Sequence, residues 1–329
     1  MTAAQESPSV VVALCTYNGA AYLREQLDSI AGQTRLPSRL LVLDDCSKDN
    51  TVGILQHFAS SAPFPVEIVR NETNLGYVKN FEKALGFCHE DVVVLSDQDD
   101  VWVPDKLAKI ERYLFDYPEI DAVFTDAELV DSERRAYGYS LWESIEFNTR
   151  EQRWVESGDA FRVLLRRNVV TGATMAFRSR VKARVLPIPR EWVHDEWISI
   201  IIAATGRLGF LPEKLIQYRQ HGANQIGARR LSSVEKFKKL FTKRTGFHQN
   251  LYVRAKLLRS HLSGLTCAPV STDVIHDLDC KLDHLSIRSY LPQARLLRLM
   301  PIIQEFVRGR YFRYSSGWKS VVRDLFEPF

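Results

Sequence analysis

The chain has 329 residues, a formal net charge of +4 and an apolar content of 45%. This length allows one large domain, or one domain with an appendage, around a substantial hydrophobic core. The first ten residues are polar, and no stretch approaches the roughly 18 consecutive apolar residues of a membrane span, so we expect a protein that is neither exported nor membrane-spanning.

Cysteine usage indicates a reducing compartment. The five cysteines, at positions 15, 46, 88, 267 and 280, form neither a CxxC pair nor a metal-binding spacing. An odd number of cysteines without such motifs is typical of reduced thiols in a cytosolic protein.

The first part of the chain alternates between strand and helix patterns. Short runs rich in Val and Leu predict strands that are buried on both faces, and each run precedes an amphipathic helix pattern. The predicted strands cover residues 9–16, 39–45, 66–71 and 91–97, and the predicted helices cover residues 20–33, 47–60, 76–88 and 103–118. This alternation predicts an α/β fold with a Rossmann-like, mostly parallel sheet flanked by helices.

The pattern changes after residue 120. We expect strands at 121–131 and 171–181, a helix with an acidic start at 194–206, and two short strands within 207–222. Residues 132–168 give no clear assignment. The chain becomes basic and helical beyond residue 228, so we predict an α/β domain over residues 1–228 and a basic helical C-terminal region over residues 229–329.

Positive charge is concentrated at the start of this C-terminal region. Residues 229–259 hold ten Lys or Arg and one acid, Glu235, which gives +9, and residues 308–325 form a second basic, aromatic stretch. A basic amphipathic helix can lie on an anionic membrane surface. A solvated helical face is the alternative, and the lack of a recognised binding module argues against nucleic acid as a partner.

Three carboxylates follow the fourth predicted strand, in the stretch VVVLSDQDDVWVPDKL. Asp97, Asp99 and Asp100 fall within four residues, at the edge where open α/β sheets bind ligands. The carboxylates could cap the next helix in water, pair with Lys or Arg, or bind a hard divalent cation, which carboxylate oxygens suit. Because polar loops after the other strands converge on the same edge, the setting favours the cation.

Four segments together resemble the nucleotide-sugar half of family 2 glycosyltransferases, which are inverting enzymes of the GT-A fold. The segments are CTYNGAAYLREQLDSIAGQT, LLVLDDCSKDNT, NLGYVKNFEKAL and VVVLSDQDDVWVPDKL, and the resemblance runs over residues 8–225. It implies a nucleotide-sugar half at about 8–130 and an acceptor half at about 131–228. The form SDQDDVW resembles the rhamnosyltransferase-like branch, which builds bacterial surface polysaccharides such as O-antigen.

The resemblance implies a metal site after the fourth strand. Asp97 and Asp99 match the family's DxD motif, where Mn²⁺ or Mg²⁺ bridges the protein and the donor diphosphate. Asp100 belongs to the same loop and would contact the metal or the ribose. His221 matches a histidine that often completes the metal site, although a lone histidine is more often structural.

The resemblance also implies a nucleotide site. Thr16 and Tyr17 match the first loop, which flanks the base, and Asp45 matches the carboxylate that accepts a hydrogen bond from a uracil or thymine N–H. Arg219 could reach a phosphate oxygen. Loop packing for Tyr17, helix capping for Asp45 and a surface ion pair for Arg219 are the alternatives.

Inverting transfer needs one carboxylate that deprotonates the acceptor hydroxyl. Asp195 matches this base at the start of a predicted helix, where the helix dipole favours the ionised form. His194 replaces the first residue of the family's ED pair, and Glu196 is an alternative base. A helix-capping role for Asp195 also stays open.

The acceptor side offers weaker candidates. Gly172 matches a glycine loop near the acceptor, where it either allows close approach of the sugar or serves only a turn. Trp197 lies two residues from the proposed base and could stack on the acceptor sugar, as could three further tryptophans at 102, 142 and 192. Most tryptophans, however, are core residues.

These features predict an inverting, metal-dependent glycosyltransferase. Its donor would be a dTDP- or UDP-linked sugar, with rhamnose as a candidate. Its acceptor would be a saccharide hydroxyl on a polyprenyl diphosphate lipid. We therefore expect a cytoplasmic protein, peripheral on the inner face of the cytoplasmic membrane. A sugar nucleotidyltransferase is one rival, although the first loop lacks the glycine-rich, basic sequence of that class. A non-catalytic carbohydrate-binding protein on the same fold is the other.

Overall fold

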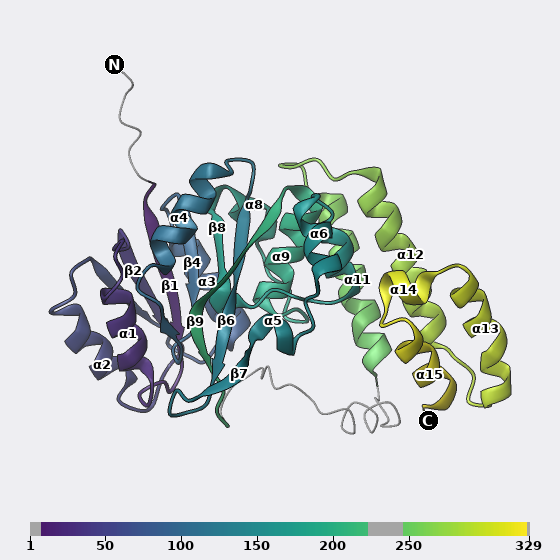
Figure 1. Ribbon diagram of the computed structural model, residues 1–329, viewed down its shortest axis with the longest axis horizontal. Helices are drawn as coiled ribbons and strands as arrows, with labels where there is room; N and C mark the ends of the chain where they lie inside the picture. The colour runs from purple at the N-terminus through teal and green to yellow at the C-terminus, as the bar shows by residue number, and fades with distance from the viewer. Residues whose placement is uncertain (1–7, 223–245, 328–329) are drawn as a thin grey trace, which may run out of the picture.

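The computed structural model describes residues 8–222 and 246–327, and these residues form one nine-stranded sheet with helices on both faces (Figure 1). The strands are β1 (Val10–Thr16), β2 (Arg39–Asp44), β3 (Val66–Arg70), β4 (Val92–Ser96), β5 (Val101–Trp102), β6 (Ala122–Val130), β7 (Ala136–Ser140), β8 (Met175–Arg178) and β9 (Leu208–Arg219). Their order is β3-β2-β1-β4-β8-β6-β9-β5, and β7 pairs with β6 outside this path.

The first four predicted strands and helices are confirmed. β3, β2, β1 and β4 are parallel, and the apolar side chains of β1, β2 and β4 are fully or almost fully buried. The helices that connect this region are α1 (Leu23–Ala31), α2 (Thr51–Ala59), α3 (Tyr77–Phe87) and α4 (Lys106–Asp116). Parallel crossovers are right-handed, so α1 and α2 cover one face, and α3, which returns across the sheet, covers the other against β1 and β2.

The second half of the sheet is mixed. β8 runs antiparallel between β4 and β6, whereas β6 and β9 are parallel. The prediction of two short strands within residues 207–222 is wrong, because β9 is one 12-residue strand. The stretch around Pro212 resembles a turn in sequence, but β9 continues past it and absorbs the irregularity as a register shift against β6.

The unassigned residues 132–168 contain β7 and three short helices, α5 (Leu141–Ser144), α6 (Thr149–Glu156) and α7 (Ala160–Arg166). Capping boxes begin α5, from Ser140 to Glu143, and α6, from Asn148 to Glu151. They are followed by α8 (Lys182–Val185) and α9 (His194–Thr205), and α9 begins close to its predicted start.

The C-terminal region is helical. It consists of α11 (Phe247–Gly264), α12 (Thr272–Ser289), α13 (Arg295–Val307), α14 (Arg310–Tyr314) and α15 (Trp318–Phe326). Leu258, Leu262, Leu278 and Leu285 are buried and continue the hydrophobic core of the sheet domain. Part of the predicted basic segment, residues 229–245, lies outside the described residues.

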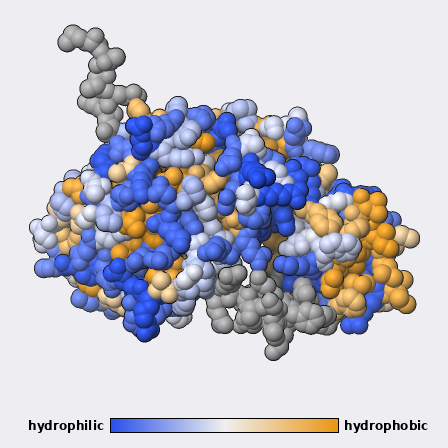
Figure 2. Space-filling model, in the orientation of Figure 1, coloured by the Kyte–Doolittle hydropathy of each residue, from blue (hydrophilic) through white to orange (hydrophobic). Residues whose placement is uncertain are grey.

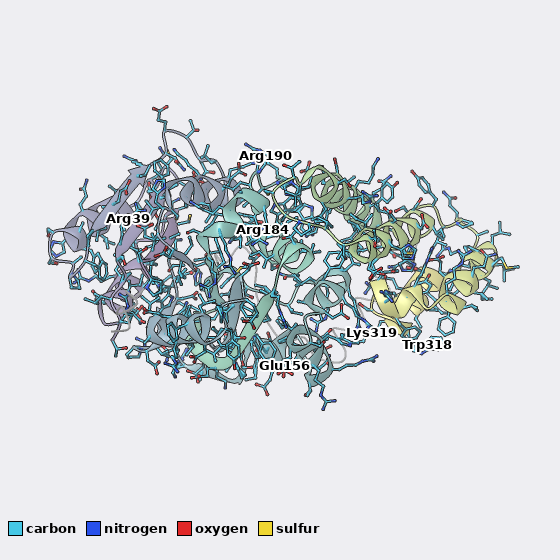
Figure 3. All side chains as sticks on the ribbon, turned by 90° about the horizontal axis from the view of Figure 1, so that it is seen from above. Arg39, Glu156, Arg184, Arg190, Trp318 and Lys319 are labelled. Atoms are coloured by element: carbon cyan, nitrogen blue, oxygen red, sulfur yellow. The ribbon has the colours of Figure 1, made fainter. Side chains whose placement is uncertain are left out.

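Hydrophobic side chains gather on the surface over this C-terminal end, while hydrophilic side chains predominate elsewhere on the face shown (Figure 2). Seen from above, the C-terminal helices extend the long axis of the molecule, and Trp318 and Lys319 mark that end (Figure 3). Within the described residues, no helix has the length and apolar character that crossing a bilayer requires. All five cysteines are free thiols.

Candidate active site

A cavity of about 790 Å³ lies at the carboxyl ends of β1 and β4 and beside the first turn of α9. It collects residues from loops that are far apart in sequence. The predicted site residues among its lining are Thr16, Tyr17, Asp45, Asp97, Asp99, Gly172, Asp195 and His221. The structure therefore brings together most of the side chains that the sequence singled out.

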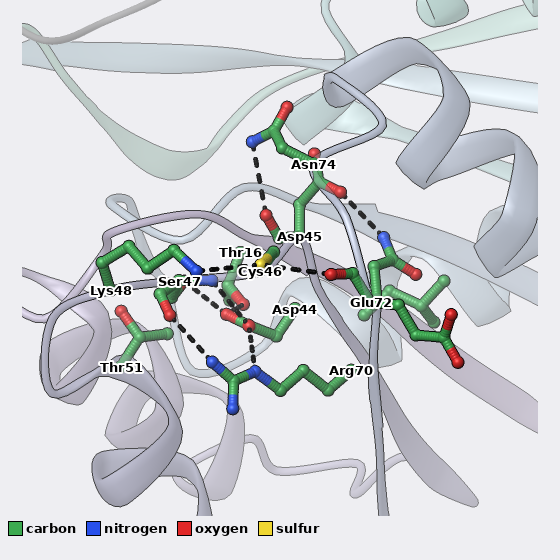
Figure 4. A network of polar contacts seen from close by, with 12 residues as sticks. Thr16, Asp44, Asp45, Cys46, Ser47, Lys48, Thr51, Arg70, Glu72 and Asn74 are labelled. Atoms are coloured by element: carbon green, nitrogen blue, oxygen red, sulfur yellow. Dashed lines mark hydrogen bonds and ion pairs between the residues drawn. The ribbon is translucent and has the colours of Figure 1, made fainter.

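The loop after β2 forms one wall of this cavity and is held by its own two carboxylates (Figure 4). Asp44 is fully buried and accepts hydrogen bonds from the Thr16 hydroxyl (3.1 Å) and from the Ser47 backbone N–H (2.9 Å). Its carboxylate also lies 3.7 Å from the Arg70 guanidinium. The Thr16 hydroxyl thus donates its hydrogen bond within the protein, and Asp44 orients the loop.

Asp45 is buried and accepts three hydrogen bonds. Its donors are the Asn71 side-chain amide (2.8 Å) and the backbone N–H groups of Leu75 (2.8 Å) and Gly76 (2.9 Å). Gly76 immediately precedes α3, so the carboxylate fixes the start of that helix while it lines the cavity. Capping and base recognition are compatible here, because each carboxylate oxygen has two lone pairs.

Gln98 was missed by the sequence reasoning. Its side-chain oxygen accepts from the Tyr17 backbone N–H (2.8 Å), and its amide donates to the Tyr17 carbonyl (3.1 Å). A side chain at Gly19 would collide with Gln98, since a Cβ there would lie 2.2 Å from the amide oxygen. Gln98 therefore connects the loop after β1 to the acidic loop after β4, which contains Asp97 and Asp99. Tyr17 stays 45% exposed.

The acidic loop brings a carboxylate and an imidazole together. Asp99 Oδ2 lies 2.9 Å from His221 Nε2, and the His221 ring packs on the Tyr22 ring with centroids 4.6 Å apart. Burial raises the pKa of Asp97 to about 7, with Asp99 and Asp195 adding to the effect and Lys106 opposing it. These carboxylates carry more negative charge than their protein surroundings offset.

Asp100 lies beneath the cavity rather than in its lining. It is 1% exposed, and its Oδ1 accepts from the Arg219 backbone N–H (3.0 Å). Its other oxygen has no hydrogen-bond partner within the described part of the chain. Burial and then the charges of Asp99 and Asp97 raise the pKa of Asp100 well above its usual range.

The donor set fits a hard divalent cation that completes its coordination with substrate oxygens. Asp97, Asp99 and His221 line the cavity and offer carboxylate and imidazole ligands, which Mn²⁺ and Mg²⁺ accept. Such cations are usually held by one or two protein carboxylates together with substrate phosphates and water. The orphaned Oδ2 of Asp100 adds to the local demand for positive charge.

Arg219 holds the acidic loop from below. It is 1% exposed, and its guanidinium donates to the Asp99 carbonyl (2.8 Å), the Ser132 carbonyl (2.6 Å) and the Glu25 carboxylate (3.0 Å). It does not line the cavity. The structure therefore favours a positioning role for Arg219 over the predicted contact with a phosphate oxygen.

Lys106, the first residue of α4, is a second cation that the sequence reasoning did not single out. Its side chain is fully buried, donates to the Ala173 carbonyl (2.9 Å) and lies 3.8 Å from the centre of the Trp102 ring. Burial lowers the pKa of Lys106 to about 7, and Asp100 and Asp97 oppose this effect. Lys106 links the acidic loop to the glycine loop on the acceptor side.

Asp195 lies in the first turn of α9 and lines the cavity. Its carboxylate accepts from the backbone N–H groups of Gly172 (2.8 Å) and Glu196 (2.7 Å). Burial raises the pKa of Asp195 to about 6, and these hydrogen bonds moderate the rise. A Cβ at residue 172 would lie 2.7 Å from His194 Nε2, so the predicted acceptor residue Gly172 allows the glycine loop to approach the base closely.

The neighbours of Asp195 are less suited to act as the base. Glu196 forms an ion pair with Arg254 of α11. His194 is buried and stacks on Phe81, with ring centroids 4.0 Å apart, and burial lowers the pKa of His194 to about 3. The imidazole is therefore neutral, and neither nitrogen has a hydrogen-bond partner within the described residues.

The four tryptophans considered for sugar stacking lie in the core, which corrects the expectation for Trp197. Its side chain is fully buried, and its Nε1–H donates to the Val185 carbonyl (2.7 Å), so the ring does not face the acceptor. Trp102, Trp142 and Trp192 are also buried. Trp197 is close to Asp195 in sequence, but it lies on the face of α9 that packs into the core.

Comparison with known proteins finds similarity to one family of glycosyltransferases. Residues 11–167 match the model of glycosyl transferase family 2. An uncharacterized protein of Mycobacterium tuberculosis is 30% identical over 213 residues, which cover 63% of this chain and 57% of that relative. A dTDP-rhamnosyl transferase, RfbG of Shigella flexneri, is 27% identical over 239 residues, which cover 69% of this chain and 78% of the relative. The chain thus spans little more than half the length of the mycobacterial relative.

Solved structures share the fold at low sequence identity. TarS of S. aureus, residues 1–349 in complex with UDP-GlcNAc, superposes with a TM-score of 0.61 at 15% identity, over 97% of this chain and 90% of that one. The mannosyltransferase PcManGT from Pyrobaculum calidifontis, in complex with GDP-Man and Mn²⁺, gives 0.54 at 19% identity, over 98% and 86%. Residues 11–167 of the chain thus match glycosyl transferase family 2, and its fold is the GT-A fold.

Proposed function

We propose that this protein transfers a sugar from a nucleoside-diphosphate sugar to an acceptor hydroxyl, with inversion at the anomeric carbon and with help from Mn²⁺ or Mg²⁺. One observation carries the proposal: the acidic loop, the Asp45 loop and Asp195 line a single cavity of about 790 Å³. The family assignment and the Mn²⁺ complex of a structural neighbour support it.

The proposed donor site uses two walls of the cavity. The base of the nucleotide lies against Tyr17 and the Asp45 carboxylate, which is held ready by three hydrogen bonds. Asp97, Asp99 and His221, which line the cavity, would hold the metal ion. When bound, the cation offsets the negative charge that grows on the departing diphosphate.

The proposed base is Asp195. Its carboxylate takes the proton of the acceptor hydroxyl as that oxygen attacks the anomeric carbon and the bond to the diphosphate breaks. A pKa near 6 leaves the carboxylate mostly ionised at neutral pH and still basic enough to accept a proton. The ion pair between Glu196 and Arg254 makes Glu196 the weaker candidate.

The finer assignments follow from similarity. The dTDP-rhamnosyl transferase among the relatives makes dTDP-rhamnose the first donor to test, ahead of UDP- and GDP-linked sugars. We infer a saccharide acceptor on a polyprenyl diphosphate lipid, within bacterial surface polysaccharide synthesis, and a location on the inner face of the cytoplasmic membrane.

Isothermal titration with nucleotide sugars tests the donor assignment. We expect one dTDP- or UDP-linked sugar to bind in the presence of Mn²⁺ and to bind far more weakly after the metal is chelated. Equal affinity with and without the metal would remove the cation from the proposal. Consumption of a nucleoside triphosphate and a sugar 1-phosphate, with release of the triphosphate's β- and γ-phosphates as pyrophosphate, would favour the nucleotidyltransferase instead.

A further inference from the structure

Helix α13 presents its apolar side to solvent. Five of its large apolar residues follow the i, i+3, i+4, i+7 spacing of one helix face, extended by one turn. Their exposed fractions are 81% for Leu296, 41% for Leu299, 65% for Met300, 53% for Ile303 and 78% for Val307. A helix at the surface of a water-soluble domain normally turns such a stripe toward the core, so this orientation needs a cause.

The opposite side of α13 is buried and partly charged. Arg298 is 2% exposed and donates to backbone carbonyls of Pro292 (2.8 Å) and Asp324 (3.0 Å). Glu305 is fully buried, accepts from His284 Nδ1 (2.7 Å) and pairs with Arg310 (3.2 Å). Rotating the helix to bury its apolar stripe would break these contacts of Arg298 and Glu305. The inner contacts therefore keep the apolar face of α13 turned outward.

Aromatic residues extend this apolar face. The Phe306 ring packs against Trp318 and Phe312, with centroids 4.6 and 5.6 Å away, and Trp318 is 60% exposed. Figure 2 shows hydrophobic side chains gathered over this end of the molecule, and Figure 3 marks Trp318 and Lys319 there. We call the exposed apolar residues of α13, together with Phe312 and Trp318, the α13 surface.

The exposed charges of this segment share one sign. Residues 295–326 contain seven Lys or Arg and two acids. Both acids, Glu305 and Asp324, are buried. The exposed cations are Arg295, Arg308, Arg313 and Lys319. Three of these cations have acidic partners, Arg308 in Glu305, Arg313 in Asp277 and Lys319 in Glu146. With seven cations and two acids, residues 295–326 still carry a net +5, so the α13 surface is an apolar stripe within a net-cationic segment.

We propose that the α13 surface docks the protein on an anionic membrane, with α13 lying in the plane of the lipid interface. Interfacial helices combine an apolar face that enters the acyl boundary with basic residues that meet anionic headgroups. Tryptophan prefers the same interface, which suits the exposed ring of Trp318. The inference rests on the proposed function only in choosing a membrane as the occupant.

A second copy of the chain fits this surface less well. A two-fold dimer through the α13 surface would bring the same patch of both copies together, and with it Arg295, Arg308, Arg313 and Lys319 of each. Like charges at close range oppose that arrangement, whereas anionic headgroups relieve it. Phe312 and Trp318 belong to the second basic, aromatic stretch at residues 308–325, whereas α13 lies outside both basic stretches that the sequence indicated.

Vesicle flotation of the full chain tests the docking surface. The probes are vesicles of phosphatidylcholine alone and vesicles that also contain phosphatidylglycerol, without any nucleotide sugar. We expect binding to the anionic vesicles to exceed binding to the neutral ones by at least about tenfold. The triple variant Leu296→Gln, Met300→Gln and Ile303→Gln should lose at least about tenfold of the anionic binding.

A matched variant separates this surface from exposed apolar residues in general. Phe87→Gln, Phe115→Gln and Val253→Gln change side chains that are 36%, 58% and 44% exposed elsewhere, and should leave vesicle binding unchanged. Thermal unfolding and titration with the donor check that both variants fold. A protein that binds vesicles but no nucleotide sugar would support the docking surface while overturning the proposed function.

Three results would overturn the docking surface. The first is a triple variant that floats as well as the unmodified protein, and the second is equal binding to neutral and anionic vesicles. The third is a dimer, detected by light scattering, that dissociates in the triple variant while no vesicles are bound. That last result would assign the α13 surface to a second copy of the chain.

Discussion

The two acidic walls of the cavity differ in how their carboxylates are satisfied. On the nucleotide wall, formed by the loops after β1 and β2, Asp44 and Asp45 accept several hydrogen bonds from the protein. On the reaction wall, formed by the acidic loop and the start of α9, burial raises the pKa of Asp97 to about 7 and of Asp195 to about 6.

This difference indicates that the two walls have different roles in ligand binding. Hydrogen bonds from the protein preorganise the nucleotide wall, so its shape does not depend on a ligand. The reaction wall keeps carboxylates whose charge the protein alone does not offset, and such groups are typical of sites that bind a cation or exchange a proton.

The largest expected effect comes from removing the proposed base, Asp195. Asp195→Asn should lower kcat by roughly 10²–10⁴-fold, because an amide cannot accept the acceptor proton. The donor Kd should change little, since the nucleotide wall is untouched. Glu196→Gln is the matched control, and its smaller loss would reflect only the broken pair with Arg254. If Glu196→Gln were the more damaging change, the base would have to be reassigned; product formation and calorimetry measure the two quantities.

The metal ligands come next. Asp99→Ala should weaken Mn²⁺-dependent donor binding by about 10–100-fold, because the cation loses a carboxylate and His221 loses its 2.9 Å partner. His221→Ala should have a similar effect, and the double variant should show less than the sum of the two losses, since the residues act as a pair. Titration with and without Mn²⁺ measures this, and purely additive losses would contradict a shared site.

The pH dependence of the reaction should follow the base. The pKa of Asp195 is raised to about 6, so lowering the pH from 7 to 5 protonates most of the carboxylate. We expect kcat to fall by about tenfold over that interval, because only the ionised form accepts a proton. The rate should be nearly flat between pH 7 and 8. A rate that is constant down to pH 5 would exclude Asp195 as the titrating group.

Part of the candidate site could be predicted from the sequence, because its residues belong to local motifs. Asp45, Asp97, Asp99 and Asp195 were found because each follows a strand or begins a helix within a recognisable local motif. Their convergence was predictable, since carboxyl ends of parallel strands meet at one edge. The alternation of the first eight elements fixed the α/β part for the same reason, because its contacts repeat a local pattern.

The site predictions that were wrong or missing concern residues whose positions depend on packing between distant segments. Trp197 was considered for the site because it lies two residues from the proposed base, and Arg219 because it could reach a phosphate oxygen, but burial decides which way a side chain faces, and both face inward. Gln98 and Lys106 have no motif of their own, because their roles come from Tyr17 and Ala173 across the fold. The outward face of α13 was equally hidden, since buried ion pairs rather than periodicity orient that helix.

The smallest effects concern stability, and here the two walls should differ in how the effect depends on pH. Asp45→Asn replaces a carboxylate that accepts from three N–H donors, so one amide donor would face another donor. We expect the free energy of unfolding at pH 8 to fall by about 1–3 kcal/mol. Urea unfolding followed by tryptophan fluorescence measures it.

Asp195→Asn also places an amide donor opposite a backbone N–H, because both oxygens of Asp195 accept, from Gly172 and Glu196. The pKa of Asp195 is raised to about 6 in the folded protein, so the fold prefers the protonated form. That preference is complete below the ordinary aspartate pKa and is lost as the pH rises through 6, so the variant should compare with the unmodified protein more favourably at pH 8 than at pH 4, by about 1–3 kcal/mol. An effect of Asp195→Asn on the free energy of unfolding that is the same at both pH values would mean that the Asp195 carboxylate is as well satisfied as that of Asp45.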